Sequence, residues 1–327
     1  MKVTILGTAN AWGPNPNLTP PAPWPMKGKL LNGRIVEIRK YRTSLLVETF
    51  DGKTILIDCG PDFSNQLRQF RFQIPDAILI THAHLDHIGG LDELSLYKPK
   101  KERLPIPVYA TEACWNCIKT DRGFGYLLSP KVDLVTDELL FKDKDDPSFA
   151  IGSVTITPFK VEHHNTVAPG AVGFVFEETI EGQTKRVLYT GDFWAITNPA
   201  DSLFAKQFEV VIIECDRWDK LAGPAVGGGH MSFQEAVRLF LSGAFSDPSP
   251  KQVVFVHFVS SVATGSQVDI MLAVGSHTLM FSSSLLNQSS EIYDRVLSLP
   301  GIGEFLKLSN SPSVPVSTVL SYSIEKF

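Results

Sequence analysis

Ten residues, THAHLDHIGG (81–90), carry three histidines and one aspartate directly after an apolar run. In an extended chain the side chains of His82 and His84 lie on the same side. Asp86 and His87 come next and begin a turn toward two glycines. Neutral imidazoles and carboxylates are ligands for zinc, manganese and iron, and two such ions about 3.5–4 Å apart can share a bridging water. The spacing therefore predicts a metal site rather than ordinary polar surface.

The elements that position these residues are predicted to be strands, with a helix late in the chain. Apolar runs predict the strands, and the Asp51-Gly52 pair predicts a hairpin between two of them. The predicted strands are KVTILGT (2–8), two strands within TSLLVETFDGKTILIDCG (43–60), DAILITHAH (76–84), SVTITPFKVEHH (153–164), AVGFVFEE (171–178), KRVLYTGD (185–192), FEVVIIECD (208–216) and QVVFVHFV (252–259). A helix is predicted over 232–243, with a capping box from Ser232 to Glu235. The chemically active residues follow strand ends, which hold side chains rigidly while the next loop leaves them open to substrate.

The histidine stretch resembles the HxHxDH signature of the metallo-β-lactamase superfamily. As in that superfamily, a strand ending in LIDCG (56–60) precedes it. The resemblance covers residues 1 to about 260 and implies an α/β fold. The expected architecture is an αββα sandwich, in which two mixed β-sheets pack face to face between helices and two metals lie at one edge of the sheets.

The same resemblance implies a full set of seven metal ligands. The three later ligands occur in the expected order, as His163 in TPFKVEHHN, Asp192 in LYTGD and His257 in VVFVHF. The implied ligands are His82, His84 and His163 for one ion, Asp86, His87 and His257 for the other, and Asp192 as a bridge between them. Asp86 is also a candidate catalytic residue. The cofactors are expected to be two divalent ions, Zn²⁺ or Mn²⁺, between which the sequence does not distinguish.

Two assignments near the ligands stay open. His163 and His164 point to opposite faces if the strand continues through them, so only one is a ligand. Alignment favours His163, and the other ring is expected to form hydrogen bonds beside the metals or to face the substrate. Asp58 in LIDCG is either a turn residue after a buried strand or a carboxylate that orients a metal-bound imidazole.

His230 in GGGHMSFQEA is a candidate catalytic residue that is not a metal ligand. In the superfamily, the branch that includes the phosphoribosyl 1,2-cyclic phosphate phosphodiesterases carries a histidine in this interval, and the tRNA 3′-end-processing endonucleases also place one late in the chain. A histidine that titrates near neutral pH can hold or protonate a phosphate oxygen.

The resemblance therefore implies a dinuclear metal-dependent hydrolase, and His230 favours a phosphodiesterase. The expected substrate is a small phosphodiester, with cyclic ones included, attacked by a metal-activated water. The alternatives are a hydrolase of lactones or β-lactams and an endonuclease like those that process tRNA 3′ ends. A nucleic-acid partner stays open but is disfavoured, because the net charge is −5.

Cysteine usage separates this chain from the phosphonate-pathway members of that branch. Those enzymes carry a zinc knuckle of cysteines after the first strand, where this chain has a proline-rich stretch without cysteine. Cys114 and Cys117 form a lone CxxC pair that is expected to be structural. With four cysteines in 327 residues, reduced thiols are expected. The basic run 98–103 is expected to be a solvated loop.

The chain is predicted to form a single metallo-hydrolase domain over 1–327. Residues 11–34 are expected to be a proline-rich loop insertion that contains Trp12 and Trp24. Residues 260–327 show no closing strand pattern, have no assigned role and include His277, which is expected to be structural or exposed. No signal-peptide core or apolar run of about 18 residues occurs, which predicts a cytoplasmic protein without a membrane partner. A homodimer stays open.

Overall fold

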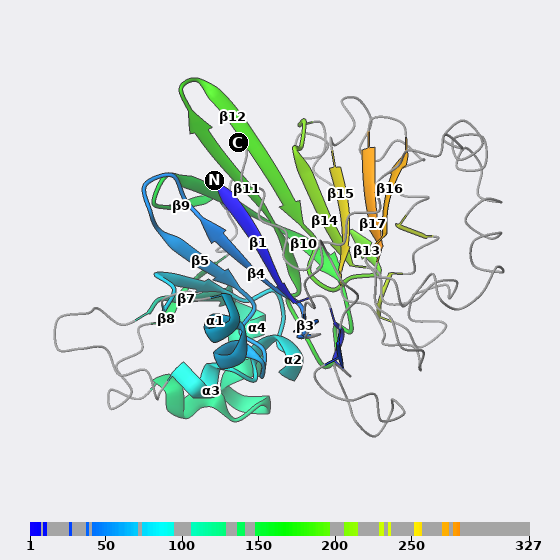
Figure 1. Ribbon diagram of the computed structural model, residues 1–327. Helices are drawn as coiled ribbons and strands as arrows, with labels where there is room; N and C mark the ends of the chain where they lie inside the picture. Colours follow the sequence, from blue (N-terminus) through cyan, green and yellow to red (C-terminus); the bar gives the residue numbers. More distant parts are fainter. Residues whose placement is uncertain are drawn as a thin grey trace.

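The polypeptide forms two large β-sheets that pack against each other (Figure 1). In this computed structural model the described residues are 1–7, 9–11, 26–27, 37–38, 41–70, 74–94, 106–128, 136–140, 148–196, 206–214, 229–231, 235–236, 252–256, 270–274 and 277–281. Alternating and continuous apolar runs supply the strands, as expected for sheets whose faces are buried.

The first sheet contains the strand that leads to the histidine stretch. Its strands are β1 (Lys2–Gly7), β4 (Ser44–Glu48), β5 (Thr54–Ile57), β6 (Ala77–Leu79), β7 (Val108–Thr111) and β8 (Thr136–Leu140), in that spatial order. The pairs β1–β4 and β4–β5 are antiparallel, whereas β5–β6, β6–β7 and β7–β8 are parallel. The sheet is therefore mixed, and the parallel strands end at the same edge.

The second sheet contains the later strands and is also mixed. Its strands are β9 (Phe149–Ile151), β10 (Val154–Glu162), β11 (Val172–Ile180), β12 (Gln183–Tyr189), β13 (Ala195–Ile196), β14 (Val210–Glu214), β15 (Gln252–Val256), β16 (Ile270–Val274) and β17 (His277–Phe281). The spatial order is β13-β10-β11-β12-β14-β15-β17-β16, with β9 paired to β10. From β12 to β17 the neighbouring strands are parallel. A separate two-stranded sheet joins β2 (Met26–Lys27) and β3 (Glu37–Ile38).

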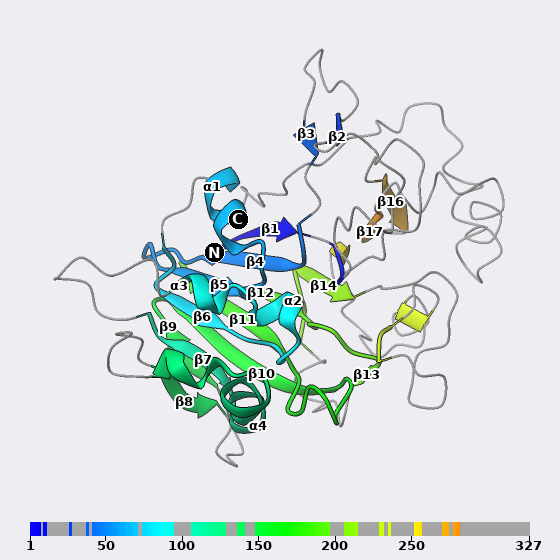
Figure 2. The same cartoon turned by 90° about the horizontal axis from the view of Figure 1, so that it is seen from below.

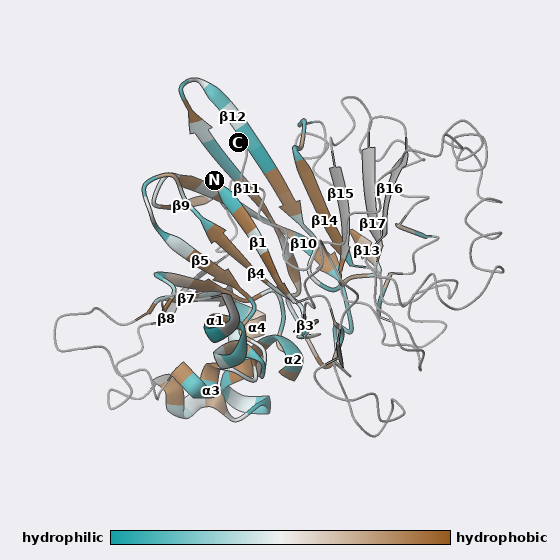
Figure 3. Cartoon of the chain, viewed as in Figure 1, coloured by the Kyte–Doolittle hydropathy of each residue, from teal (hydrophilic) through white to brown (hydrophobic). Residues whose placement is uncertain are grey.

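The core between the two sheets follows from the alternation of side chains along each strand. In the hairpin β4–β5, Leu45 and Ile57 face the second sheet, whereas Leu46 and Leu56 face the opposite side. All four are fully buried, so the first sheet is covered on both faces. In Figure 3 β11 and β12 are hydrophilic near the turn that joins them, whereas their opposite ends are hydrophobic. Each such fully buried aliphatic side chain contributes about 1.5–3 kcal/mol.

The described helices cover the outer face of the first sheet. They are α1 (Phe63–Phe70), α2 (Leu85–Ile88), α3 (Leu91–Leu94) and α4 (Glu112–Asn116), and α4 runs on into a π-helical turn η1 (Cys117–Asp121) and a 3-10 turn η2 (Phe124–Leu128). Their apolar residues, such as Phe63, Ile88 and Trp115, pack with Leu46 and Leu56. Seen from below in Figure 2, the helices are spread over the strands of this sheet, from α1 beside β1 to α4 near β7 and β8.

The predicted strands and the Asp51-Gly52 hairpin are confirmed, with two corrections. The expectation that residues 260–327 lack strands was wrong, because β16 and β17 extend the second sheet there. Strand β2 also falls inside the predicted loop 11–34, of which the described residues are 11 and 26–27. β2 is two residues long and β16 and β17 are five each, so such short strands carry little periodicity of their own.

Candidate metal centre

The histidine stretch begins just beyond strand β6, at the edge where the parallel strands of the first sheet end. The strand ends at Leu79 rather than at His84, so this predicted boundary was wrong. The reason is that the N–H of Thr81 donates to Oδ1 of Asp58 at 2.8 Å instead of continuing a strand ladder. The chain can therefore turn, and helix α2 begins four residues after Thr81.

Asp58 is the carboxylate from which this turn is organised. It follows β5, is fully buried and has a φ of 61°, a left-handed conformation that is uncommon for residues other than glycine. Its Oδ2 accepts hydrogen bonds from the hydroxyl of Thr81 at 2.9 Å and from Nδ1 of His87 at 2.8 Å. Of the two roles that the sequence left open for Asp58, the geometry supports that of an imidazole-orienting carboxylate.

These hydrogen bonds fix the positions of protons on two histidine rings. A carboxylate only accepts hydrogen bonds, so Nδ1 of His87 is the donor to Asp58. The hydroxyl of Thr81 donates to Asp58, and its oxygen therefore accepts from Nδ1 of His82, which lies 3.0 Å away. In a neutral ring the second nitrogen carries no proton. The Nε2 atoms of His82 and His87 consequently direct lone pairs into the site.

One group of converging donor atoms comes from both sheets. Its members are His82, His84, His163 and Asp192, with ligand atoms within 4.8 Å of one another. Nδ1 of His84 lies 3.0 Å from Nε2 of His82 and 3.1 Å from Nε2 of His163. His163 follows β10, and its Nδ1 donates to the carbonyl oxygen of Gly229, which leaves the Nε2 lone pair facing the group. This set is called the first group below.

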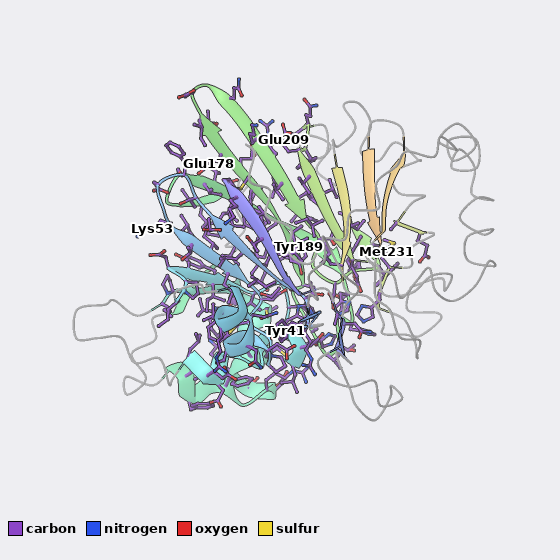
Figure 4. All side chains as sticks on the ribbon, in the orientation of Figure 1. Tyr41, Lys53, Glu178, Tyr189, Glu209 and Met231 are labelled. Atoms are coloured by element: carbon purple, nitrogen blue, oxygen red, sulfur yellow. The ribbon has the colours of Figure 1, made fainter. Side chains whose placement is uncertain are left out.

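A second group consists of Asp86, His87 and Asp192. Nε2 of His87 lies 3.2 Å from Oδ2 of Asp86 and 3.2 Å from Oδ2 of Asp192. The same oxygen of Asp192 lies 3.7 Å from Nε2 of His82 in the first group. Asp192 follows Tyr189, the last residue of β12, which is fully buried between the sheets and labelled in Figure 4. The two groups therefore share one carboxylate on a rigid strand end.

The first group fits a metal ion better than a hydrogen-bond network. Burial lowers the pKa of His82 and His163 well below the usual value and lowers the pKa of His84 to about 4. The rings are therefore neutral at pH 7. Two lone-pair nitrogens then face Nδ1 of His84, which has at most one proton to donate. A divalent cation accepts all three lone pairs, and imidazoles with a carboxylate are typical ligands of zinc and similar ions.

The second group fits a cation for a different reason. Burial acts to lower the pKa of His87, but the carboxylates of Asp192, Asp86 and Asp58 outweigh it and raise the pKa well above the usual value. The Nε2 lone pair of His87 and two carboxylate oxygens meet at one point, which requires positive charge there. A proton supplies that charge in the cation-free protein, and a divalent ion supplies it better because it binds all three atoms.

His230 lies beside both groups and is held by a carboxylate that the sequence analysis missed. Nδ1 of His230 donates to Oε1 of Glu214 and lies 3.9 Å from Oδ2 of Asp192. Glu214 is fully buried at the end of β14 and also accepts a hydrogen bond from the N–H of Phe193. A signal was available, because an acidic residue that ends the apolar run VVII resembles Asp58 after ILI.

His163, rather than His164, belongs to the first group. Strand β10 ends at Glu162, and His164 has a φ of 24°, so the chain has already turned. The ring of His164 is half-buried and lies 4.9 Å from the ring of His163 and 5.6 Å from that of His230, measured between centroids. Burial and the neighbouring His230 lower the pKa of His164.

Some predicted residues lie outside the described residues. They are His257, Ser232 of the capping box, Trp12, Trp24, Cys215 and the basic run 98–103. Strand β15 ends at Val256, directly before His257, and Val256 pairs with Glu214. The described end of β15 therefore lies beside the strand end that holds His230.

The described cysteines are free thiols, as expected. Cys59, Cys114 and Cys117 are buried and form no disulfide. Cys114 lies in α4, and Cys117 begins the π-helical turn. Burial raises the pKa of each of these thiols, which leaves them protonated and unreactive at neutral pH.

Arg122 ties together two of the loops that carry the first group. Its Nε donates to the carbonyl oxygen of Ala83, between two of the histidines, at 2.9 Å. Its Nη2 donates to the carbonyl oxygen of Val167, in the loop after His163, at 2.7 Å. A second tie runs from the hydroxyl of Thr111 to the carbonyl oxygen of Gly170 at 2.8 Å. The segment from α4 to Arg122 thus braces one ligand loop against the other.

Comparison with known proteins supports this description. The family model described as "Beta-lactamase superfamily domain" matches residues 53–258. Within the described part of the chain, no helix is long and apolar enough to span a membrane.

Two relatives differ in how much of them the chain covers. An octanoyltransferase from Porphyromonas gingivalis is 34% identical over 125 residues, which is 38% of this chain and 25% of that protein. The anti-Pycsar protein Apyc1 from Bacillus phage 010DV004 is 28% identical over 232 residues, which is 67% of this chain and 82% of that protein. The chain thus spans about a quarter of the first relative and most of the second.

Among solved structures, the human short-form tRNase Z (ELAC1) has a TM-score of 0.56 at 20% identity. The match covers 80% of this chain and 96% of that one. At this identity the likeness shows the fold alone, and with the two mixed sheets it confirms the predicted αββα sandwich.

We predict that Asp58→Asn weakens metal binding while leaving most of the fold. An asparagine cannot accept from all three donors, because half of its amide is itself a donor. Loss of such an orienting partner typically lowers metal affinity about 10–100-fold. Competition with a chromophoric chelator measures this, with Asp51→Asn in the exposed β4–β5 turn as the matched control. Equal affinities in both variants would contradict the orienting role.

We also predict that Arg122→Ala lowers metal affinity more than its effect on the metal-free fold accounts for. Two charged hydrogen bonds, each worth about 1.5–3 kcal/mol, are lost between the ligand loops. The expected loss in affinity is about tenfold, with partial recovery in Arg122→Lys. Arg186→Ala, which breaks a pair with Glu177 on β11, is the control. If both arginine variants bind metal alike, the brace has no role in the site.

Proposed function

Because the chain belongs to the beta-lactamase superfamily, we propose that it is a dinuclear metal-dependent hydrolase that cleaves small phosphodiesters, cyclic ones included. The observation that carries the proposal is the position of Asp192, whose carboxylate belongs to both groups of donor atoms. A histidine held by a carboxylate lies directly beside it. Paired cation sites next to a proton donor are suited to the displacement of an alcohol from phosphorus.

The residues that would hold the ions follow from the two groups. They are His82, His84, His163 and Asp192 for one ion, and Asp86, His87, Asp192 and the sequence-predicted His257 for the other. When bound, the ions supply positive charge that acidifies water and neutralises phosphoryl oxygens. Both Zn²⁺ and Mn²⁺ suit this donor set.

His230 supplies the proton for the departing alcohol. Glu214 accepts a hydrogen bond from Nδ1, and its negative charge stabilises the imidazolium, which carries its second proton on Nε2. As the bond from phosphorus to the leaving oxygen breaks, Nε2 donates that proton to the oxygen. The ring returns to the neutral form and keeps its hydrogen bond to Glu214.

Asp86 acts at the opposite end of the reaction. Its carboxylate is buried in the first turn of α2, and its Oδ2 lies 3.2 Å from Nε2 of His87. In this position it accepts a hydrogen bond from the attacking water, orients it and takes up the proton that the water loses as its oxygen bonds to phosphorus. One proton is therefore accepted by Asp86 and one is given by His230 for each ester bond cleaved.

The substrate is a small molecule rather than a polynucleotide. A net charge of −5 gives no general attraction to a nucleic-acid backbone. The half-buried rings of His164 and His230 lie beside the first group, where they suit a single anionic ester. Activity is assayed with bis-p-nitrophenyl phosphate, a cyclic nucleotide, a ribosyl cyclic phosphate, a lactone, a chromogenic cephalosporin and an unprocessed tRNA, each with zinc and with manganese. Turnover of the lactone, the cephalosporin or the tRNA in preference to the small phosphodiesters would refute the proposal.

We predict that the metal-replete protein carries close to two divalent ions and that a chelator abolishes activity. His82→Ala should lose about one ion and most turnover while keeping its fold, since the first group lies in loops at the ends of strands. His277→Ala is the matched control, because His277 begins β17 beside the amino end of β15, away from the strand ends that carry the site. Elemental analysis and circular dichroism measure these effects. A metal-free wild type would refute the dinuclear site.

We further predict that His230→Ala keeps its metal but lowers kcat by about 10²–10⁴ for substrates with alkyl or ribosyl leaving groups. p-Nitrophenol leaves without protonation, so a p-nitrophenyl ester should lose little. Glu214→Gln should show the same pattern to a smaller extent, because it weakens the hold on Nδ1 of His230. Equal losses on both esters would indicate binding rather than acid catalysis, and loss of metal would make His230 a ligand.

A further inference from the structure

The imidazole of His164 is held beside the first group without belonging to it. Its ring centroid lies 4.9 Å from that of His163, 5.7 Å from that of His84 and 5.6 Å from that of His230. The ring is half-buried, whereas that of His163 is fully buried. His164 is therefore more exposed than His163 of the first group, and it lies next to His230, the proposed acid.

The backbone fixes this position in a conformation that side chains with a Cβ rarely adopt. The φ of His164 is 24°, and its carbonyl oxygen accepts from the N–H groups of Val167 at 2.9 Å and Ala168 at 2.8 Å. Non-glycine residues that are held in such sparsely populated backbone regions cluster at functional sites. The planes of the His163 and His164 rings are inclined to each other by 71°.

Gly229 completes the seat of the ring. A Cβ atom at position 229 would lie 2.4 Å from Cδ2 and 2.5 Å from Nε2 of His164, so only glycine lets the ring pack on this backbone. The same residue accepts from Nδ1 of His163 through its carbonyl oxygen and precedes His230. One short segment, 229–230, thus positions three histidines together.

Within the described residues, the ring nitrogens of His164 form no hydrogen bond, although its ring contacts three other histidines. A neutral imidazole always carries one N–H donor. Resting on the proposed function, we propose that His164 and His230 form an oxyanion subsite that binds a phosphoryl oxygen of the substrate. The chemical class it takes is a tetrahedral oxyanion, and inorganic phosphate is its simplest member.

The subsite provides N–H donors to an oxyanion, whereas the two metal groups provide ligands for cations. One ring comes from the turn after β10 and the other from position 230, so an oxyanion between them is contacted from two sides. His230 gives its proton to the leaving oxygen, whereas His164 donates a hydrogen bond to an oxygen that stays on phosphorus. His164 should therefore contribute to substrate binding more than to the chemical step.

The test is phosphate binding by the metal-loaded protein, measured by calorimetry. His164→Ala is expected to raise the Kd for inorganic phosphate about tenfold, with unchanged metal content and thermal unfolding. KM for the best phosphodiester should rise while kcat changes little. His164→Gln keeps an N–H donor and should recover part of the loss. The control is His277→Ala. Unchanged phosphate affinity in His164→Ala, or loss of a metal ion, would overturn the subsite.

A second variant tests the contact between Gly229 and the ring of His164. Gly229→Ala should displace the imidazole of His164 and weaken phosphate binding. In protein whose metal content is unchanged, which shows that His163 is still held, this effect should not add to that of His164→Ala, because both then act through one ring. Fully additive losses would refute this seat. Phosphate binding is measured without turnover, so a protein that binds phosphate through His164 yet cleaves no phosphodiester would refute the proposed reaction and keep the subsite.

Discussion

The hydrogen bonds to the carboxylate of Asp58 are the interaction on which the rest of the site depends. Because this group can only accept, it determines which nitrogen of His87 keeps a proton and, through the hydroxyl of Thr81, which nitrogen of His82 does so. One buried anion thus sets the direction of lone pairs in both groups of ligands. It also ends strand β6 by taking the N–H of Thr81, so local geometry and donor chemistry have the same cause.

The site exists because strand ends from both sheets meet at one edge. His82 and His84 follow the first sheet, whereas His163 and Asp192 follow strands of the second. The buried hydrophobic layer between the sheets fixes the distance between these ends, since packed cores deform little. Arg122 adds a polar tie between two of the loops. Ligand positions are therefore a consequence of how the sandwich packs.

What could be predicted from sequence was local. The ligands between 82 and 87 and the apolar strands could be recognised because spacing and periodicity are properties of one segment. The part that Glu214 plays could not, because its partner His230 is brought near only by the fold. The end of β6 at Leu79 depends on the hydrogen bond from the N–H of Thr81 to Asp58. The turn at His164 depends on its positive φ. Neither is visible in the spacing of residues. Position 257, which lies outside the described residues, stays a prediction.

The first group draws its ligands from segments that belong to different sheets and lie far apart in the chain. An ion bound there would act as a non-covalent cross-link between the two halves of the sandwich. By mass action such a ligand favours the closed, folded chain over the open one. Closing so long a loop has an entropic cost that a bound ion offsets. The concentration of free metal would then raise the free energy of unfolding of a sandwich that its core already holds together, and would also decide whether the enzyme is active.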